Sequence, residues 1–300
     1  MWNQITANIR QATGQNFRGT HRRPVGGGSI NQAYALSDRD SDRDFDGDRP
    51  STSTLAYFVK LNQASRIAMF EAEAFALSQI AATKSIRVPH PVCWGTVEDS
   101  AYIVLEWLDF GYGDHQAWED MGRNLAALHR VTHSQCFGWE QSNTIGSTPQ
   151  VNSWKTSWLE FFAEHRLGYQ LQLAHRRGGH FPLGNKLLAT LPEILAGHEP
   201  QPSLVHGDLW SGNAAITQQG ESVVFDPAAY FGDREVDIAM TQLFGSFPAN
   251  FYSAYNDAFP LLTGYPQRRI LYNLYHVLNH FNLFGGGYES QANQMIESLL

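Results

Sequence analysis

The chain has 300 residues, of which 43% are hydrophobic and 17% charged, and its net charge at pH 7 is −8. This composition is typical of a globular protein with one large or two modest domains, and the acidic balance argues against a general nucleic-acid binder. The two cysteines imply no disulfide framework. No apolar run reaches the length of a membrane span and the first residues do not resemble a secretory signal, so we expect a cytoplasmic protein.

The first hundred residues predict a short helix followed by a small sheet. Residues 5–13 favour the helix, and two strands are expected on either side of a glycine-rich turn. Glycine lets backbone N–H groups come close to a phosphate, so Gly27, Gly28 and Ser29 are candidate nucleotide contacts. The turn matches no G-x-G-x-x-G pattern, and a plain flexible hairpin explains the same residues.

Residues 37–54 (SDRDSDRDFDGDRPSTST) form a low-complexity segment rich in Asp and Arg. A segment with so few apolar groups cannot bury enough surface to become ordered. We therefore predict a mobile insertion between two strands, which we expect to be solvated rather than to act as a functional acidic arm.

A third strand at 55–61 and a helix at 65–82 carry the first charged pair of interest. Ser65 is the expected N-cap of the helix, and Glu73 lies near the centre of its apolar face at about 100° per residue. The residues of that face are Ile67, Phe70, Ala74, Leu77 and Ala81.

A carboxylate on a buried face needs a cation, and Lys60 on the preceding strand is the candidate partner of Glu73. In kinases a pair of this kind positions the nucleotide phosphates. An exposed lysine beside a glutamate at the edge of the buried face is the alternative. The downstream loops described below favour the functional pair.

Two further strands are expected at 92–97 and 101–105. The chain then leaves the sheet through Glu106, Trp107 and Leu108, where a linker between lobes is due. Backbone groups of such a linker commonly bind adenine, so these three residues are candidate nucleotide contacts.

The sequence thus divides into a nucleotide-covering lobe at 1–108 and a helical lobe at 109–300. Helices of the second lobe are predicted at 115–131, 154–173, 181–195, 235–244, 251–259, 268–283 and 292–300.

The loop HGDLWSGN at 206–213 has the most informative spacing in the chain. Asp208 begins a D-x₄-N pattern that ends at Asn213, and Asp226 directly follows the apolar run at 223–225. A phosphotransferase needs one carboxylate to accept the proton of the attacking hydroxyl. It also needs an amide and a second carboxylate to hold Mg²⁺. A lone HGD turn could carry a solvated aspartate, but three polar groups at strand ends indicate a shared role.

Other residues near this loop have supporting or substrate-binding roles in our interpretation. We expect His206 to bond to the loop backbone and Asp237 to brace the loop from its helix. Trp210 is a candidate platform for the substrate, with packing of the loop as the alternative. His280 and Asn282 are polar residues on an otherwise apolar helix and are candidate substrate contacts.

The order of these features resembles the protein-kinase-like fold of small-molecule kinases, which aminoglycoside phosphotransferases and choline kinases share. Several stretches are similar, more narrowly, to the fructosamine kinase (ketosamine 3-kinase) family. They are FVKLN at 58–62, MFEAEA at 69–74, PQVNSW at 149–154, FFAEHRL at 161–167, HGDLWSGN at 206–213, DPAAYFGDREVDIAM at 226–240 and LNHFNLFG at 278–285.

This resemblance implies an α+β fold with a small antiparallel-sheet lobe, one key helix and a larger helical lobe. It implies ATP-dependent phosphorylation of the 3-hydroxyl of a ketoamine, the sugar adduct on a small amine or on a glycated protein. We expect a monomer with no nucleic-acid or membrane partner. Asp208 would be the base, Asn213 and Asp226 the magnesium ligands, and Lys60 and Glu73 the phosphate-positioning pair. Ser29 stands where many family members have Cys, so redox control through that thiol is not expected.

Two alternatives to a ketoamine kinase follow from the same residues. One is a kinase of this fold that acts on another small alcohol, such as an aminoglycoside, choline or homoserine. The other is a non-catalytic pseudokinase that binds a ligand or a partner protein. Asp208, Asn213 and Asp226 are all present, which argues against the second alternative.

Overall fold

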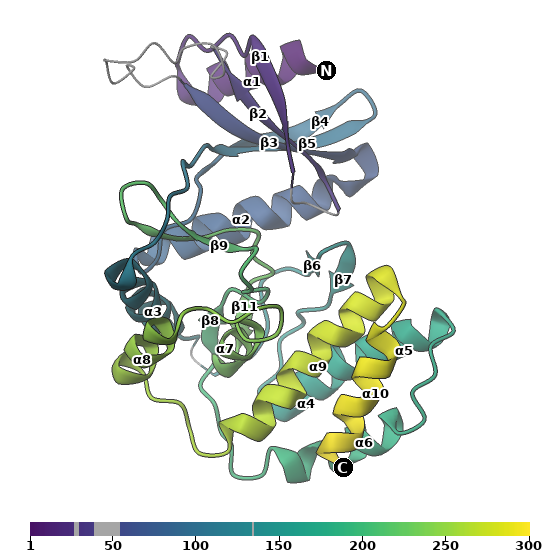
Figure 1. Cartoon of the computed structure of the whole chain (residues 1–300). Coiled ribbons are helices and arrows are strands. Elements are labelled where there is room, and N and C mark those ends of the chain that lie inside the picture. Colours follow the sequence, from purple (N-terminus) through teal and green to yellow (C-terminus); the bar gives the residue numbers. More distant parts are fainter. Residues whose placement is uncertain (27–29, 39–54, 134) are drawn as a thin grey trace. The chain divides into compact units, whose positions relative to one another are not determined.

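The computed structural model describes residues 1–26, 30–38, 55–133 and 135–300. Two compact units make up the chain (Figure 1): Met1–Ala82 with Val88–Phe110, and Thr83–Arg87 with Gly111–Leu300. Residues 83–87 therefore belong to the second unit, although the sequence placed them in the first lobe. The physical reason is a backbone contact, because the Val224 N–H donates to the Arg87 carbonyl at 3.0 Å. Most of the expected insertion at 37–54 lies outside the described residues.

The first unit is built on one antiparallel sheet of five strands in the order β1-β2-β3-β5-β4 (Figure 1). Helix α1 packs against this sheet, and Ile5 and Ile9 of the helix join Val59 and Val104 in one buried cluster. The elements are α1 (Trp2–Thr13), β1 (His21–Val25), β2 (Gln32–Ser37), β3 (Ala56–Gln63), β4 (Pro91–Val97) and β5 (Ser100–Glu106).

Helix α2 (Ile67–Thr83) follows β3 through a short 3₁₀ turn at Ala64–Arg66. Ser65 lies inside that turn, so the prediction that it caps the helix is wrong. The tighter i to i+3 bonding takes the place of a side-chain cap at the end of the strand. Phe70, Glu73, Ala74 and Leu77 are buried as expected, whereas Ala81 is exposed near the end of the helix.

The second unit is mainly helical, and α9 passes through its core with Leu271, Leu274 and Leu278 fully buried. Together with the antiparallel sheet of the first unit, these helices confirm the α+β class. Its helices are α3 (His115–His129), α4 (Trp158–Phe162), α5 (Tyr169–Arg176), α6 (Gly184–Ile194), α7 (Glu235–Met240), α8 (Ala249–Ala258), α9 (Tyr265–Phe284) and α10 (Tyr288–Leu299).

The helix expected from residue 154 onward begins later and is not regular. It starts at Trp158, where the Ser157 hydroxyl accepts a hydrogen bond from the Glu160 N–H at 3.3 Å. A π-helical segment at Ala163–Gly168 then separates α4 from α5. Among the described residues, no helix is long and apolar enough to cross a membrane.

Three short antiparallel strand pairs complete the described part of the second unit, and two of them carry the loops of interest. Their strands have three residues each, which is too short for a periodic pattern. They are β6 (Asn143–Ile145) with β7 (Thr148–Gln150), β8 (Ser203–Val205) with β11 (Tyr230–Gly232), and β9 (Ala214–Ile216) with β10 (Ser222–Val224). The loop 206–213 connects β8 to β9, and Asp226 follows β10.

Candidate active site

The loop between β8 and β9 is folded around Asp208. The Asn213 side-chain amide donates to the Asp208 carbonyl at 2.8 Å and to its carboxylate at 3.3 Å. The Asn213 N–H also donates to the Trp210 carbonyl at 2.9 Å. The D-x₄-N spacing thus closes a compact loop in which the amide nitrogen faces Asp208. The amide oxygen is the atom that a hard cation would take.

Asp237 on α7 holds this loop from behind. One carboxylate oxygen accepts from the His206 N–H at 2.7 Å, and the other accepts from the Gly207 N–H at 2.8 Å. Burial opposes ionisation of this carboxyl, but hydrogen bonds from His129 and the loop backbone keep its pKa below the ordinary value. The expectation that Asp237 braces the loop is confirmed.

The bracing continues into the core through side chains that we did not anticipate. His129 on α3 lies 3.0 Å from the Asp237 carboxylate through Nε2 and 2.8 Å from the Tyr255 hydroxyl through Nδ1. Arg234 donates to the same hydroxyl at 3.0 Å. A fully hydrogen-bonded chain of this kind rigidifies a buried polar site.

His206 is a structural residue of the loop, as expected. It is fully buried, and its Nε2 bonds to the Phe225 carbonyl at 2.9 Å while its Nδ1 accepts from the Asp208 N–H at 3.3 Å. Burial lowers its pKa, so the imidazole is neutral. The next residue must be glycine, because Gly207 has φ of 82° and a Cβ there would lie 2.2 Å from the Ala228 carbonyl oxygen.

Asp226 comes to the same part of the second unit from the neighbouring hairpin. The Phe225 N–H donates to the Asn213 carbonyl at 3.0 Å, so the residue before Asp226 is bonded to Asn213 through the backbone. Asp226 has φ of 57°, in the left-handed region that side chains other than glycine rarely adopt. Strained residues of this kind cluster at functional sites. Its side chain is exposed.

The surroundings of Asp208 change its ionisation. Burial is the main cause that raises the pKa of Asp208 to about 7, and the charge of Asp226 adds to it. The hydrogen bond from Asn213 acts in the opposite direction. Only 19% of the Asp208 side chain is exposed, which agrees with a strong desolvation effect. A divalent cation held by Asn213 and Asp226 would favour the ionised form of Asp208 and offset the increase in its pKa.

Within the first unit, the structure brings Lys60 and Glu73 together. Lys60 Nζ on β3 lies 2.7 Å from Glu73 Oε1 on α2, and both side chains are buried. An ion pair with so little solvent access is costly to form, so it is more readily explained by a function than by stability alone. This geometry agrees with the phosphate-positioning pair expected from the sequence.

The other candidate nucleotide contacts are at the end of β5. The Glu106 N–H donates to the His90 carbonyl at 2.8 Å, and Trp107 Nε1 donates to Asp109 at 2.8 Å. Leu108 follows in the extended linker. Three of the predicted contacts, Gly27, Gly28 and Ser29, lie outside the described residues.

The candidate substrate residues divide into two groups. The Trp210 ring is partly buried and meets Phe244 edge-on with ring centres 6.2 Å apart, and the His280 ring centre lies 4.5 Å from that of Phe244. Asn282 instead donates to the Gln170 carbonyl at 3.0 Å and to its side chain at 2.7 Å. Its contacts join α9 to α5 and do not bring it to Asp208.

His276 is a residue of this site that sequence reasoning missed. Its Nδ1 lies 4.0 Å from Asp208 Oδ1 and has no hydrogen-bond partner. Burial lowers its pKa to about 3, so the ring is neutral. Helical spacing could have indicated His276, because it lies one turn before the candidate residue His280 on the same face of α9.

A buried ion pair between a strand lysine and a helix glutamate is present in one unit. The other unit holds a D-x₄-N loop and an aspartate at the end of the next hairpin. This combination defines the class of protein-kinase-like phosphotransferases. The family model for fructosamine kinase matches residues 1–300, and the chain belongs to that family.

Relatives of known name agree with this assignment. A probable ketoamine kinase of Synechocystis is 54% identical over 299 residues, which cover 100% of this chain and 97% of the relative. The chloroplastic protein-ribulosamine 3-kinase of Arabidopsis thaliana is 42% identical over 281 residues, with 92% of this chain and 81% of the relative covered.

Solved structures show the same fold. A crystal structure of a protein provisionally named fructosamine-3-kinase, from Haemophilus somnus, is 31% identical with a TM-score of 0.89 and covers 100% of this chain and 98% of its own. An ADP-bound aminoglycoside phosphotransferase is 11% identical with a TM-score of 0.61 over the full length of both chains. At that identity the second likeness shows the fold alone, and it confirms the protein-kinase-like fold.

Proposed function

We propose that this protein is an ATP-dependent kinase that phosphorylates the 3-hydroxyl of ketoamines, the adducts of sugars with amines or with lysines of proteins. The observation that carries the proposal is Asp208, which opens a D-x₄-N loop braced by Asp237 in a chain of the fructosamine kinase family. The names of the relatives support the ketoamine as the acceptor. Because phosphorylated ketoamines are unstable, such a reaction would begin the removal of sugars from glycated amines.

In this proposal Asp208 binds the acceptor hydroxyl and takes its proton as the phosphoryl group is transferred. Its carboxylate is held by the loop and by Asn213, so the reaction requires little rearrangement of the protein. The unpartnered Nδ1 of His276 offers a further hydrogen-bonding position beside Asp208 for the sugar.

The remaining roles concern ATP and its metal ion. Asn213 and Asp226 supply an amide and a carboxylate oxygen, which is the donor set that Mg²⁺ prefers. Magnesium, when bound there, neutralises charge on the nucleotide phosphates. Lys60, fixed by Glu73, contacts the phosphates, and backbone groups at 106–108 receive the adenine.

The direct test of this function is an assay of ATP consumption with a panel of acceptors. Ribulosamines and fructosamines should be phosphorylated in the presence of Mg²⁺, and chelation of the metal should stop the reaction. Aminoglycosides, choline and homoserine serve as the competing acceptors. Mass spectrometry and NMR of the product should place the phosphate on O3. Preference for one of the competing acceptors would overturn the proposal.

Trp210→Ala is expected to raise the KM for the ketoamine roughly tenfold and to lower kcat. An aromatic ring can cover the apolar face of a sugar, and a loosely held hydroxyl is misaligned for attack. The KM for ATP should stay within about twofold of the wild-type value, since we place adenine at the linker. Steady-state kinetics with each substrate varied in turn measures both effects.

Phe244→Ala is the matched control for Trp210, because it removes the ring that Trp210 packs against and leaves Trp210 in place. A smaller effect of Phe244→Ala on the ketoamine KM supports the platform role. Equal effects of both variants, or a parallel loss of ATP affinity, would show that Trp210 only packs the loop.

A further inference from the structure

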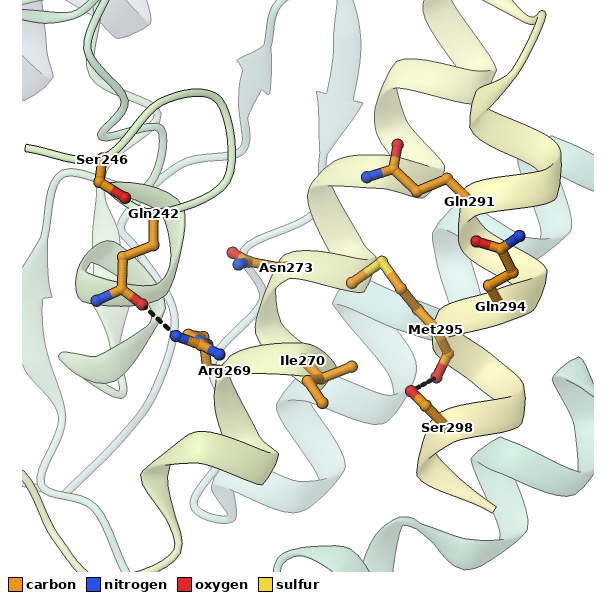
Figure 2. Close-up of a pocket in the computed structure, with 9 residues that line it drawn as sticks. All are labelled: Gln242, Ser246, Arg269, Ile270, Asn273, Gln291, Gln294, Met295 and Ser298. Carbon is orange, nitrogen blue, oxygen red and sulfur yellow. Dashed lines mark hydrogen bonds between the residues drawn. The ribbon is translucent and has the colours of Figure 1, made fainter.

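A polar pocket of about 600 Å³ lies within the second unit (Figure 2). Gln242 and Ser246 from the segment after α7 form one side, and α10 forms the other side with Gln291 and Gln294. The described lining residues comprise four side-chain amides, two hydroxyls, one arginine and two apolar residues, with no carboxylate.

Arg269 supplies the only charge among these lining residues. Its Nη1 donates to Gln242 Oε1 at 2.9 Å, and in the described part of the chain no carboxylate pairs with it. Figure 2 shows the guanidinium turned from α9 toward Gln242. A guanidinium next to neutral amides favours an anion, and its planar fork suits a carboxylate.

Asn273 is the buried polar group of the pocket. Only 7% of the residue is exposed, and its Oδ1 has no hydrogen-bond partner. A buried polar atom without a partner costs free energy, which a bound molecule can recover. A half turn of the amide exchanges its donor and acceptor, so it can serve either kind of group.

The pocket and Asp208 share two walls. Arg269, Asn273 and His276 follow one another at spacings of four and three, so they line one face of α9. His276 lies 4.0 Å from Asp208, and Arg269 lies about 10 Å further along the helix axis at 1.5 Å per residue. The second wall is the segment 242–246, since its Phe244 packs against Trp210 while Gln242 and Ser246 line the pocket.

We propose that this pocket binds the amino-acid end of a ketoamine formed on the side chain of free lysine, with Arg269 pairing with the α-carboxylate. The inference rests on the proposed ketoamine kinase function. With the sugar hydroxyl at Asp208, a lysine side chain supplies the length needed to reach along α9 to Arg269. The amides of the pocket then take the remaining polar groups of the amino acid. A lysine inside a protein chain has no free carboxylate and gains nothing from Arg269.

The experiment compares two acceptors, Nε-ribulosyl-lysine and its C-terminal methylamide, which lacks the negative charge of the carboxylate. The wild type is expected to show a KM about tenfold lower for the free carboxylate, the low end for a charge-assisted bond at a partly exposed site. Arg269→Gln should erase the difference in KM between the two acceptors, and Arg269→Lys should retain part of that difference. Arg176→Gln removes the same charge at an exposed position outside the pocket and should keep the wild-type difference.

Gln294→Glu provides a second variant, because it places a carboxylate in the pocket at an exposed position, where we expect the fold to tolerate it. It should raise the KM for the free carboxylate and leave the preference reduced or reversed. Equal KM values for both acceptors in the wild type would overturn the carboxylate site, as would an equal effect of Arg269→Gln on both. If neither acceptor is phosphorylated by the wild type, it is the proposed ketoamine kinase function that fails.

Discussion

Asp208→Asn is expected to lower kcat by roughly 10²–10⁴-fold, the usual contribution of a general base. The amide keeps the size of the side chain but cannot accept the proton of the sugar hydroxyl. The pKa of Asp208 is raised mainly by burial and then by Asp226, so removal of its charge relieves repulsion and should not destabilise the fold. Nucleotide affinity, measured by fluorescence titration with Mg·ATP, should change little.

Asp257→Asn is the matched control for this experiment. Asp257 lies exposed on α8, so its substitution removes one negative charge from the same unit without touching the loop. It should retain wild-type kcat. Turnover of Asp208→Asn within a few-fold of the wild type would show that another group takes the proton.

The residues that sequence could identify are those whose roles depend on local spacing. The D-x₄-N pattern places Asn213 against Asp208 inside one loop, and helical periodicity places Glu73 on a buried face of α2. Lys60, the partner of Glu73, could be identified because it lies on the strand that precedes the helix. The α+β class, which the resemblance to the family implied, is confirmed.

The residues that sequence could not identify depend on contacts between distant segments. His129 on α3 bonds to Asp237, and Tyr255 on α8 bonds to the other nitrogen of His129. Nothing in the sequence around either residue marks it. Strand β8 pairs with β11, which is distant in the sequence, and a strand of three residues has no periodic pattern that could reveal it. Asn282 stays a predicted substrate contact, and the hydrogen bond from its amide nitrogen to Gln170 on α5 is another contact between distant segments.

The pocket at Arg269 was missed for a similar reason. Arg269 and Asn273 lie on a helix that the sequence predicted, but the facing residues Gln291 and Gln294 belong to α10. Arginine and amide side chains on a helix normally face solvent, and only tertiary packing converts them into a binding surface.

Asp237→Asn is expected to lower both kcat and stability, because an amide cannot replace this carboxylate. Both oxygens of Asp237 accept backbone N–H groups, one from His206 and one from Gly207. In either orientation the Asn NH₂ group must face a donor, so at least one N–H is left buried without a partner. We expect the free energy of unfolding to fall by about 3 kcal/mol and kcat to fall at least tenfold.

The effect of Asp237→Asn on stability should depend on pH in a defined direction. Burial opposes ionisation of Asp237, but the hydrogen bonds and charge of His129 and the loop amides hold its folded pKa below the ordinary 3.8. Its contribution is therefore complete above about pH 4 and is lost as the pH falls through the lower folded value. Urea unfolding should show the largest difference between wild type and variant near neutral pH, and a smaller one in acid.

Hydrogen exchange separates a local role of Asp237 in the loop from a general loss of stability. In the variant, the backbone amides of His206 and Gly207 should exchange much faster than those of α9, because they lose their charged acceptor. The KM for ATP should change less than kcat, since the loop positions the acceptor hydroxyl rather than the adenine. A uniform rise in exchange across the second unit, with kcat unchanged, would mean that Asp237 stabilises the core without aligning Asp208.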